Sequence, residues 1–198
     1  MLSFAAAVFL LIITPGPGVL SLAGVGAAYG FRAGLRYFMG LFIGTNLVGL
    51  AVVTGLAALI LANPVIRTVL MAASTGYLLY MAFKIATAGS KIGFTAATRQ
   101  PGIRDGLMLQ AINPKAYVVN TTLFSGFAFL PGAYALEVTL KFIIMNVIWC
   151  ALHFLWLWVG ARIKAMNLAH RTQRAINIFM ACAMLAVVGL ALWTSLNA

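Results

Sequence analysis

Two proline-containing stretches interrupt hydrophobic segments of the chain, and both carry residues suited to binding a charged solute. The first runs from Thr14 to Gly18 with the sequence Thr-Pro-Gly-Pro-Gly, and the second is Asn113-Pro114-Lys115. Proline lacks an N–H and clashes with the preceding helical turn, while glycine raises the entropy cost of ordering the backbone. Each stretch therefore predicts a break inside a helix.

A helix break frees backbone N–H groups at the start of the next half-helix, where they carry a partial positive charge of about half a unit. Thr14 and Asn113 are good N-cap residue types, and Pro15 and Pro114 suit the first helical position. Such helix starts favour carboxylates and other anions. We therefore predict a substrate-binding site made of Thr14, Pro15, Gly16, Pro17, Gly18, Asn46, Asn113, Pro114 and Lys115.

The composition around these breaks is that of an integral membrane protein. Of 198 residues, 64% are hydrophobic and 8% are charged, and the mean hydropathy is +1.05. Soluble domains carry about a quarter charged residues. Runs without charge, near or above the ~20 residues that cross a bilayer, occupy 1–31, 37–66, 68–83, 116–136, 142–161 and 175–198.

We therefore expect an all-α polytopic membrane protein with six transmembrane helices in a single domain. The first crossing is the apolar run that ends at Phe31, and it is expected to be mature structure because the positive flank of a secretory signal is missing. The other five are expected at about 37–62, 66–88, 104–130, 135–161 and 174–197. Cys150 and Cys182 fall within these spans and are predicted to be free thiols.

Basic residues predict how the chain is oriented in the membrane. The first, third and fifth loops hold ten of them, and the second and fourth hold two. Because cytoplasmic loops are rich in lysine and arginine, the first set should be cytoplasmic and both termini outside. In this context the net charge of +11 indicates topology signals and lipid headgroup contacts rather than nucleic acid.

The two breaks indicate an internal repeat. An offset of 99 residues places Ile13-Thr14-Pro15 on Ile112-Asn113-Pro114 and superimposes the hydrophobic segments. We predict one repeat at 1–89, a loop at 90–103 and a second repeat at 104–198. Three spans in each half give the halves opposite orientation, and paired broken helices in inverted repeats indicate a substrate site near the midplane. The alternative is a pair of proline kinks without function.

Lys115 strengthens the prediction of an anion site. It lies ~15 Å along the helix from Arg104, near the middle of the membrane. A lysine there costs at least ~2.5 kcal/mol and needs a negative partner. The only acidic residues, Asp105 and Glu137, are near span ends, so a substrate carboxylate would supply the missing charge. Alternatively, Lys115 extends to the interface or lies against carbonyls freed by the first break.

Other polar residues in the spans give weaker indications. His153 is near the midplane and is a proton-relay candidate, because histidine titrates close to physiological pH; a packing histidine is the alternative. Asn46, Asn120, Thr121, Thr122, Asn146 and Tyr80 are candidates for lining a cavity or for bonding helices together. The chain has two histidines, His153 and His170, and two acidic residues, and their positions indicate no metal-binding or acid–base cluster. We therefore expect no metal, no cofactor and no enzyme activity.

At these residues the chain resembles the LysE/RhtB family of bacterial amino-acid exporters. The resemblance covers the whole chain and rests on Thr-Pro-Gly-Pro at 14–17, Asn-Pro-Lys at 113–115, Gly-Phe-Arg-Ala-Gly at 30–34 and Gly-Tyr-Leu-Leu-Tyr at 76–80. Family members often have Asn or Asp after Pro-Gly-Pro, whereas this chain has Gly18. Contacts at the first break are therefore expected to come from the backbone.

The resemblance implies efflux of amino acids or related small zwitterionic metabolites across the bacterial cytoplasmic membrane, driven by the proton motive force. The expected partners are an amino-acid-like solute and membrane lipid, and a homo-oligomer is compatible with the sequence. The scarcity of buried acids argues against a cationic substrate such as lysine. A channel or uniporter would use the same breaks and is the main alternative; a purely structural membrane protein would not need them.

Overall fold

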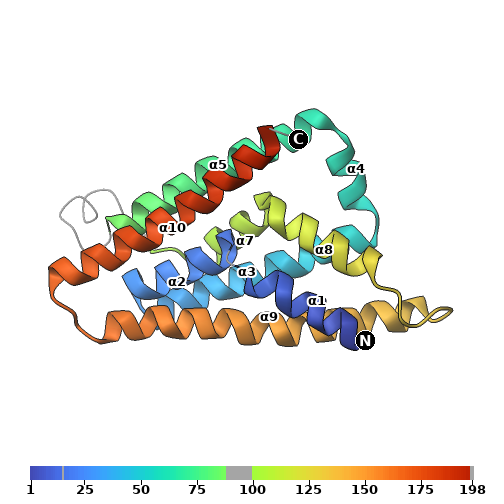
Figure 1. The fold of residues 1–198 in the computed structure, drawn as a ribbon, viewed down its shortest axis with the longest axis horizontal. Helices are drawn as coiled ribbons and strands as arrows, with labels where there is room; N and C mark the ends of the chain where they lie inside the picture. Colours follow the sequence, from blue (N-terminus) through green and yellow to red (C-terminus); the bar gives the residue numbers. More distant parts are fainter. Residues whose placement is uncertain (15, 88–99, 197–198) are drawn as a thin grey trace.

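The computed structural model describes residues 1–14, 16–87 and 100–196, and every regular element in these ranges is an α-helix (Figure 1). Pro15 of the first predicted break lies outside the described residues. So does most of the predicted loop at 90–103, including Lys91 and Arg99, which contributed to the predicted orientation. The expected all-α class is therefore confirmed for the described part of the chain.

The helices follow the predicted segments closely, and both predicted breaks separate pairs of helices. In chain order they are α1 (Leu2–Ile13), α2 (Pro17–Tyr29), α3 (Phe31–Val53), α4 (Leu56–Ala62), α5 (Pro64–Ala86), α7 (Ile103–Ile112), α8 (Pro114–Gly126), α9 (Tyr134–Ala165) and α10 (His170–Leu196).

The expected single span at 37–62 is wrong in its bounds. Helix α3 already begins at Phe31, directly after Gly30, whose φ of 88° is accessible to glycine. The same helix ends at Val53, and Gly55 with φ of 77° separates it from α4. Arg32 and Arg36, two basic residues counted in the first loop, therefore lie within α3. Long basic side chains are tolerated at a helix end because their charged heads reach the interface.

Three helices among the described residues, α3, α5 and α9, are each long and apolar enough to cross a membrane. Helices α1 and α2 taken together are also long and apolar enough to cross a membrane, with a bend of 54° between them. The bend is a broken span or a re-entrant loop, as the proline-glycine sequence predicts. The total of six crossings stays a prediction.

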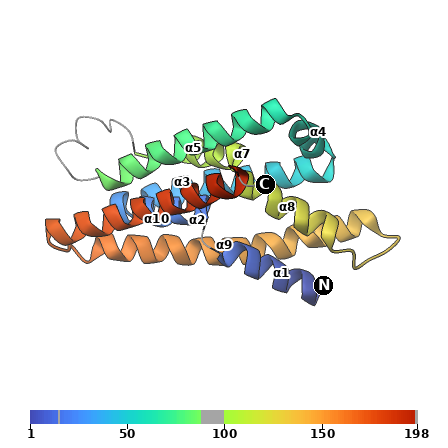
Figure 2. The ribbon, with the colours of Figure 1, turned by 45° about the horizontal axis from the view of Figure 1, so that its top comes forward.

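Among the broken helices, α2 is buried almost throughout its length, whereas α1 lies at the edge of the assembly beside α9 (Figure 2). Helix α9 runs along one side with α1 and α2 beside it, and α3 lies beside α7 and α8. Helices α5 and α10 pack against each other on the opposite side. This arrangement brings the two breaks together between α3 and α9.

Glycines allow the half-helices α2 and α7 to approach their neighbours at backbone distance. A Cβ on Gly106 of α7 would lie 2.3 Å from the carbonyl oxygen of Tyr37 in α3. A Cβ on Gly160 of α9 would lie 2.2 Å from the carbonyl oxygen of Ala23 in α2. Small residues at such crossings increase van der Waals contact, which drives association of helices in lipid. The two half-helices are thereby held firmly against α3 and α9.

Hydrogen bonds from other helices hold the far end of α2. Lys164 Nζ donates to the carbonyl oxygen of Ala28 at 2.7 Å, and Gln173 Nε2 donates to that of Ala27 at 3.0 Å. These carbonyls belong to the last turn of α2, which has no intrahelical partners for them. At the opposite end of α2, at the proline-glycine break, no side chain caps the first N–H groups.

Candidate functional site

The first break places the start of α2 two residues later than expected. Thr14 follows the last residue of α1, and its hydroxyl donates back to the carbonyl oxygen of Leu10 at 2.8 Å. The N-cap of α2 is Gly16, with extended φ and ψ of −151° and 177°, and Pro17 occupies the first helical position. The predicted role of Thr14 as N-cap is therefore wrong, and the role predicted for Pro15 falls on a residue outside the described ones.

The second proline of this break explains the difference. Steric clash with a proline ring forces the preceding residue out of the helical region, so Gly16 cannot be helical and α2 cannot begin before Pro17. Since Gly16 has no side chain, no side-chain oxygen caps the first N–H groups of α2. The start of α2 is therefore left for another group to satisfy.

The second break has the predicted capping geometry. Asn113 is the N-cap of α8, and Pro114 occupies the first helical position. Asn113 Oδ1 accepts from the backbone N–H of Lys115 at 3.1 Å, and Asn113 Nδ2 donates to Gln110 Oε1 at 3.0 Å. The two breaks are consequently unequal, because α8 supplies its own cap whereas α2 does not.

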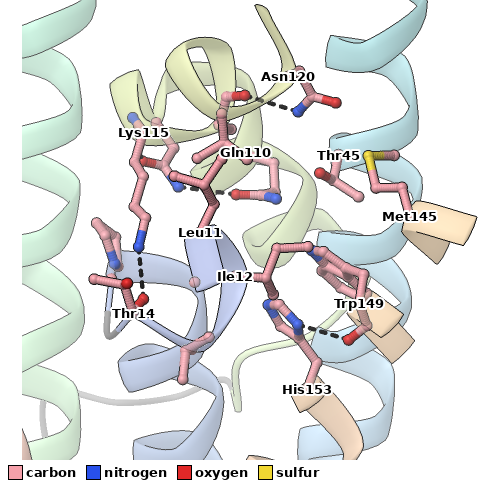
Figure 3. Close-up of a pocket in the computed structure, with 17 residues that line it drawn as sticks. Leu11, Ile12, Thr14, Thr45, Gln110, Lys115, Asn120, Met145, Trp149 and His153 are labelled. Atoms are coloured by element: carbon pink, nitrogen blue, oxygen red, sulfur yellow. Dashed lines mark hydrogen bonds between the residues drawn. The ribbon is translucent and has the colours of Figure 1, made fainter. Parts of the chain in front are cut away.

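Lys115 connects the two breaks directly (Figure 3). Its Nζ donates to the carbonyl oxygen of Thr14 at 2.6 Å, so it lies against a carbonyl freed by the first break, as one of the two alternatives for this lysine predicts. The side chain passes over Gly16, where a Cβ would lie 2.8 Å from Lys115 Cδ and 3.0 Å from Nζ. Glycine at this position therefore makes room for the lysine.

The acidic residues of the chain are engaged away from Lys115. Asp105 Oδ2 accepts from the backbone N–H of Gly102 at 2.8 Å, at the start of α7. Glu137 Oε1 pairs with Lys141 Nζ at 2.8 Å, one helical turn along α9. Because the chain has no further acids, its own carboxylates leave the charge of Lys115 to a carbonyl oxygen and to any bound anion.

A pocket of about 60 Å³ lies where the breaks meet. One water molecule needs ~10–15 Å³ of such volume, so the pocket has room for several water molecules. Thr14, Gly16, Pro17, Gly18, Asn113 and Lys115 of the predicted site line it. The remaining lining residues come from α1, α2, α3, α7, α8 and α9: Leu11, Ile12, Val19, Thr45, Gln110, Ala116, Val119, Asn120, Met145, Trp149 and His153.

His153 reaches the pocket from α9 and is 4% exposed (Figure 3). Its Nδ1 lies 2.9 Å from the carbonyl oxygen of Trp149, and the two rings stack with centroids 3.6 Å apart. A backbone carbonyl only accepts hydrogen bonds, so Nδ1 carries a proton. In the neutral ring Nε2 is then an acceptor, and it lies near Gly18.

Asn46, by contrast, is not among the residues that line the pocket. Its side chain exchanges two hydrogen bonds with that of Asn146, of 3.0 and 2.8 Å. Of the other polar candidates, Asn120 lines the pocket, whereas Thr121, Thr122 and Tyr80 are exposed on the outer faces of their helices. Asn120 Oδ1 is buried and has no hydrogen-bond partner among the described residues.

Sequence reasoning missed several residues of the pocket wall. Gln110 precedes the Asn113 cap by one helical turn, and a glutamine within an apolar span was the available signal. Thr45 directly precedes the predicted Asn46, and of these two polar residues Thr45 is the one that lines the pocket. Trp149 and Met145 carried no such signal, because apolar residues are expected throughout a membrane helix.

Comparison with known proteins gives one family match and one curated relative. The family model described as LysE type translocator matches residues 9–196. A leucine efflux protein of Klebsiella pneumoniae subsp. pneumoniae is 28% identical over 179 residues, covering 83% of this chain and 84% of that protein. No solved structure matches the chain.

Proposed function

The chain belongs to the LysE type translocator family of integral membrane proteins, and from that premise we propose that it exports small neutral amino acids. The observation that carries the proposal is the hydrogen bond from Lys115 Nζ to the carbonyl oxygen of Thr14. This hydrogen bond joins the two broken helices at the pocket, and Lys115 is the charged residue among those that line it. A solute with a carboxylate would satisfy that charge.

The carboxylate binds between the start of α2 and Lys115. The first N–H groups of α2 have no side-chain cap and carry the positive end of the helix dipole. A lysine ammonium has three donors, and Thr14 accepts one of them, so two remain for an anion. Gly18 and Val19 line the pocket at this end of α2, where backbone N–H groups rather than side chains make the contact.

The remainder of the solute lies against an apolar wall. Leu11, Ile12, Val119 and Met145 line the pocket from α1, α8 and α9. Burying an aliphatic side chain among them is favourable by roughly 1.5–3 kcal/mol, whereas a cationic side chain would find no opposite charge among the lining residues. The name of the bacterial relative, a leucine efflux protein, agrees with this chemistry. Leucine is therefore the first substrate to test.

The mechanism we propose is proton antiport by two inverted repeats that expose the pocket alternately. His153 is the group proposed to carry the proton, since it is the pocket's histidine. Support for the repeats comes from Asn46 and Asn146, which lie 100 residues apart and bond reciprocally. The predicted offset of 99 pairs Asn46 with Met145, so the two asparagines lie next to equivalent positions and are not themselves equivalent. Residues near a twofold axis between two repeats meet in this reciprocal way.

Transport by purified protein in liposomes tests the proposal. Wild-type protein should accumulate labelled leucine when a pH gradient is imposed, and Lys115→Met should reduce the rate at least about tenfold through loss of a charge-assisted hydrogen bond. Lys164→Met is the matched control, because its ammonium also donates to a backbone carbonyl but lies outside the pocket. Its transport should stay near the wild-type rate.

Three outcomes would decide against parts of the proposal. Absence of transport of any amino acid, with wild type equal to Lys115→Met, would overturn the exporter function. Equilibration of leucine without accumulation under any ion gradient would favour a uniporter or channel. Equal loss of transport in Lys115→Met and Lys164→Met would assign Lys115 a structural role.

A further inference from the structure

Two hydrogen-bond acceptors face the space left by the missing side chain of Gly18. A Cβ at this position would lie 3.8 Å from Gln110 Oε1 and 3.8 Å from His153 Nε2. Gln110 and His153 are each 4% exposed, and both line the pocket. Helices α2, α7 and α9 therefore leave a small opening whose nearest polar atoms are one amide oxygen and one ring nitrogen.

The hydrogen bonds that Gln110 and His153 make on their other sides determine that each presents an acceptor atom to the opening. Asn113 Oδ1 accepts from a backbone N–H, so Asn113 Nδ2 must be the donor to Gln110, and the atom it meets is Oε1. His153 Nδ1 donates to a backbone carbonyl, so the lone pair of the neutral ring is on Nε2. A carboxamide oxygen has two lone pairs, and Asn113 uses one of them.

An opening bounded by acceptors binds a donor. An ammonium group has three N–H donors and no acceptor, whereas a carboxylate has only acceptors and is rejected there. We propose that Gln110 and His153 bind the α-ammonium of the substrate, opposite Gly18. This assignment rests on the proposed amino-acid export. It adds the orientation of the bound substrate, with its carboxylate toward Lys115 and its ammonium toward Gln110 and His153.

The same lone pair on His153 Nε2 is the one that would take a coupling proton. The ring therefore holds either a proton or the substrate ammonium at any one time, which is the exclusion that antiport requires. The charged residue that lines the same pocket is Lys115 of α8. On α2 and α3, the Tyr37 hydroxyl donates to the Ser21 hydroxyl at 3.0 Å, so these two groups are paired with each other.

Binding of two ligands to the purified full-length protein tests the ammonium site. The ligands are leucine and 4-methylpentanoate, which has the same skeleton without the amino group, and calorimetry measures both affinities. Gln110→Met and His153→Phe keep side-chain volume but remove the acceptors. Each should weaken leucine binding by roughly tenfold to a hundredfold and leave 4-methylpentanoate binding within about twofold, so that the preference for leucine is lost.

Gly18→Ser provides a second route if the first variants do not fold. Its hydroxyl would occupy the opening and donate to one of the acceptors, which themselves stay in place, and should reduce the leucine preference in the same way. His170→Phe is the matched control, since His170 is exposed at the start of α10, and it should keep both affinities.

A retained preference for leucine in all three pocket variants would overturn the ammonium site alone. Equal weakening of both ligands would also overturn it, because a purely structural role affects them alike. Wild-type protein that binds no amino acid would instead overturn the exporter proposal, and the ammonium site with it.

Discussion

Asn46 of α3 and Asn146 of α9 donate to each other's side-chain oxygen, at 3.0 and 2.8 Å, across a separation of 100 residues. Each carboxamide thus satisfies one donor and one acceptor of its partner. Asn46 also donates to the carbonyl oxygen of Phe42 at 2.9 Å. The pair connects the two long helices that lie on either side of the broken ones.

Replacing one asparagine of this pair should destabilise the protein more than replacing both. Asn46→Leu leaves the amide of the half-buried Asn146 without its partner, and an unsatisfied polar group away from water costs about 1–3 kcal/mol. In Asn46→Leu/Asn146→Leu both polar groups are absent and the leucines can pack. Thermal unfolding of the two single variants and the double variant measures the coupling, and strictly additive effects would contradict a direct interaction.

Gly16→Ala should impair transport because the added methyl meets the Lys115 side chain. The contact would be 2.8 Å to Cδ, which requires the lysine to move away from the Thr14 carbonyl. Gly126→Ala is the control, since its Cβ would meet no atom within 4 Å. Leucine uptake into liposomes should fall at least several-fold for the first variant. Wild-type uptake by Gly16→Ala would mean that the position of Lys115 is unimportant.

Gly106→Ala should weaken the packing of α7 on α3. Its methyl group would lie 2.3 Å from a backbone oxygen, which cannot rotate aside as a side chain can. Overpacking costs typically about 1–3 kcal/mol. Gly76→Ala, also in a helix but with open space around the added Cβ, should be neutral or slightly stabilising. The melting temperatures of the two variants in detergent give the comparison, and equal values would contradict this account.

Glu137→Gln should lower thermal stability by leaving the buried Lys141 ammonium without its charged partner. Glu137 also accepts from the backbone N–H groups of Phe129 and Leu130, at 2.9 and 2.6 Å, so it holds the loop between α8 and α9. Removing both charges with Glu137→Gln/Lys141→Met should recover part of the loss, because the uncompensated charge is then absent. A double variant no more stable than the single one would argue against the pair.

Much of the architecture was predictable because hydrophobic length and backbone chemistry are local properties. Runs of apolar residues predicted the long helices, and prolines predicted both breaks, since a residue without an N–H interrupts a helix wherever it is placed. The cap at Asn113 was predictable for the same reason. At the first break α2 begins at Pro17, because a proline disfavours the helical conformation of the residue before it, here Gly16.

The composition of the pocket depended on contacts between residues distant in sequence. Gly18, Gln110 and His153 come from α2, α7 and α9, and nothing local to any of them indicates that they share one opening. Likewise, whether Asn46 faces a cavity or another helix depends on the rotation of α3 against α9. The sequence pattern by itself determined that the chain forms apolar helices with two breaks, because helix propensity and hydrophobicity are properties of local sequence. The packing of those helices determined which polar atoms meet, because close approach at glycines sets how each helix is placed against its neighbours.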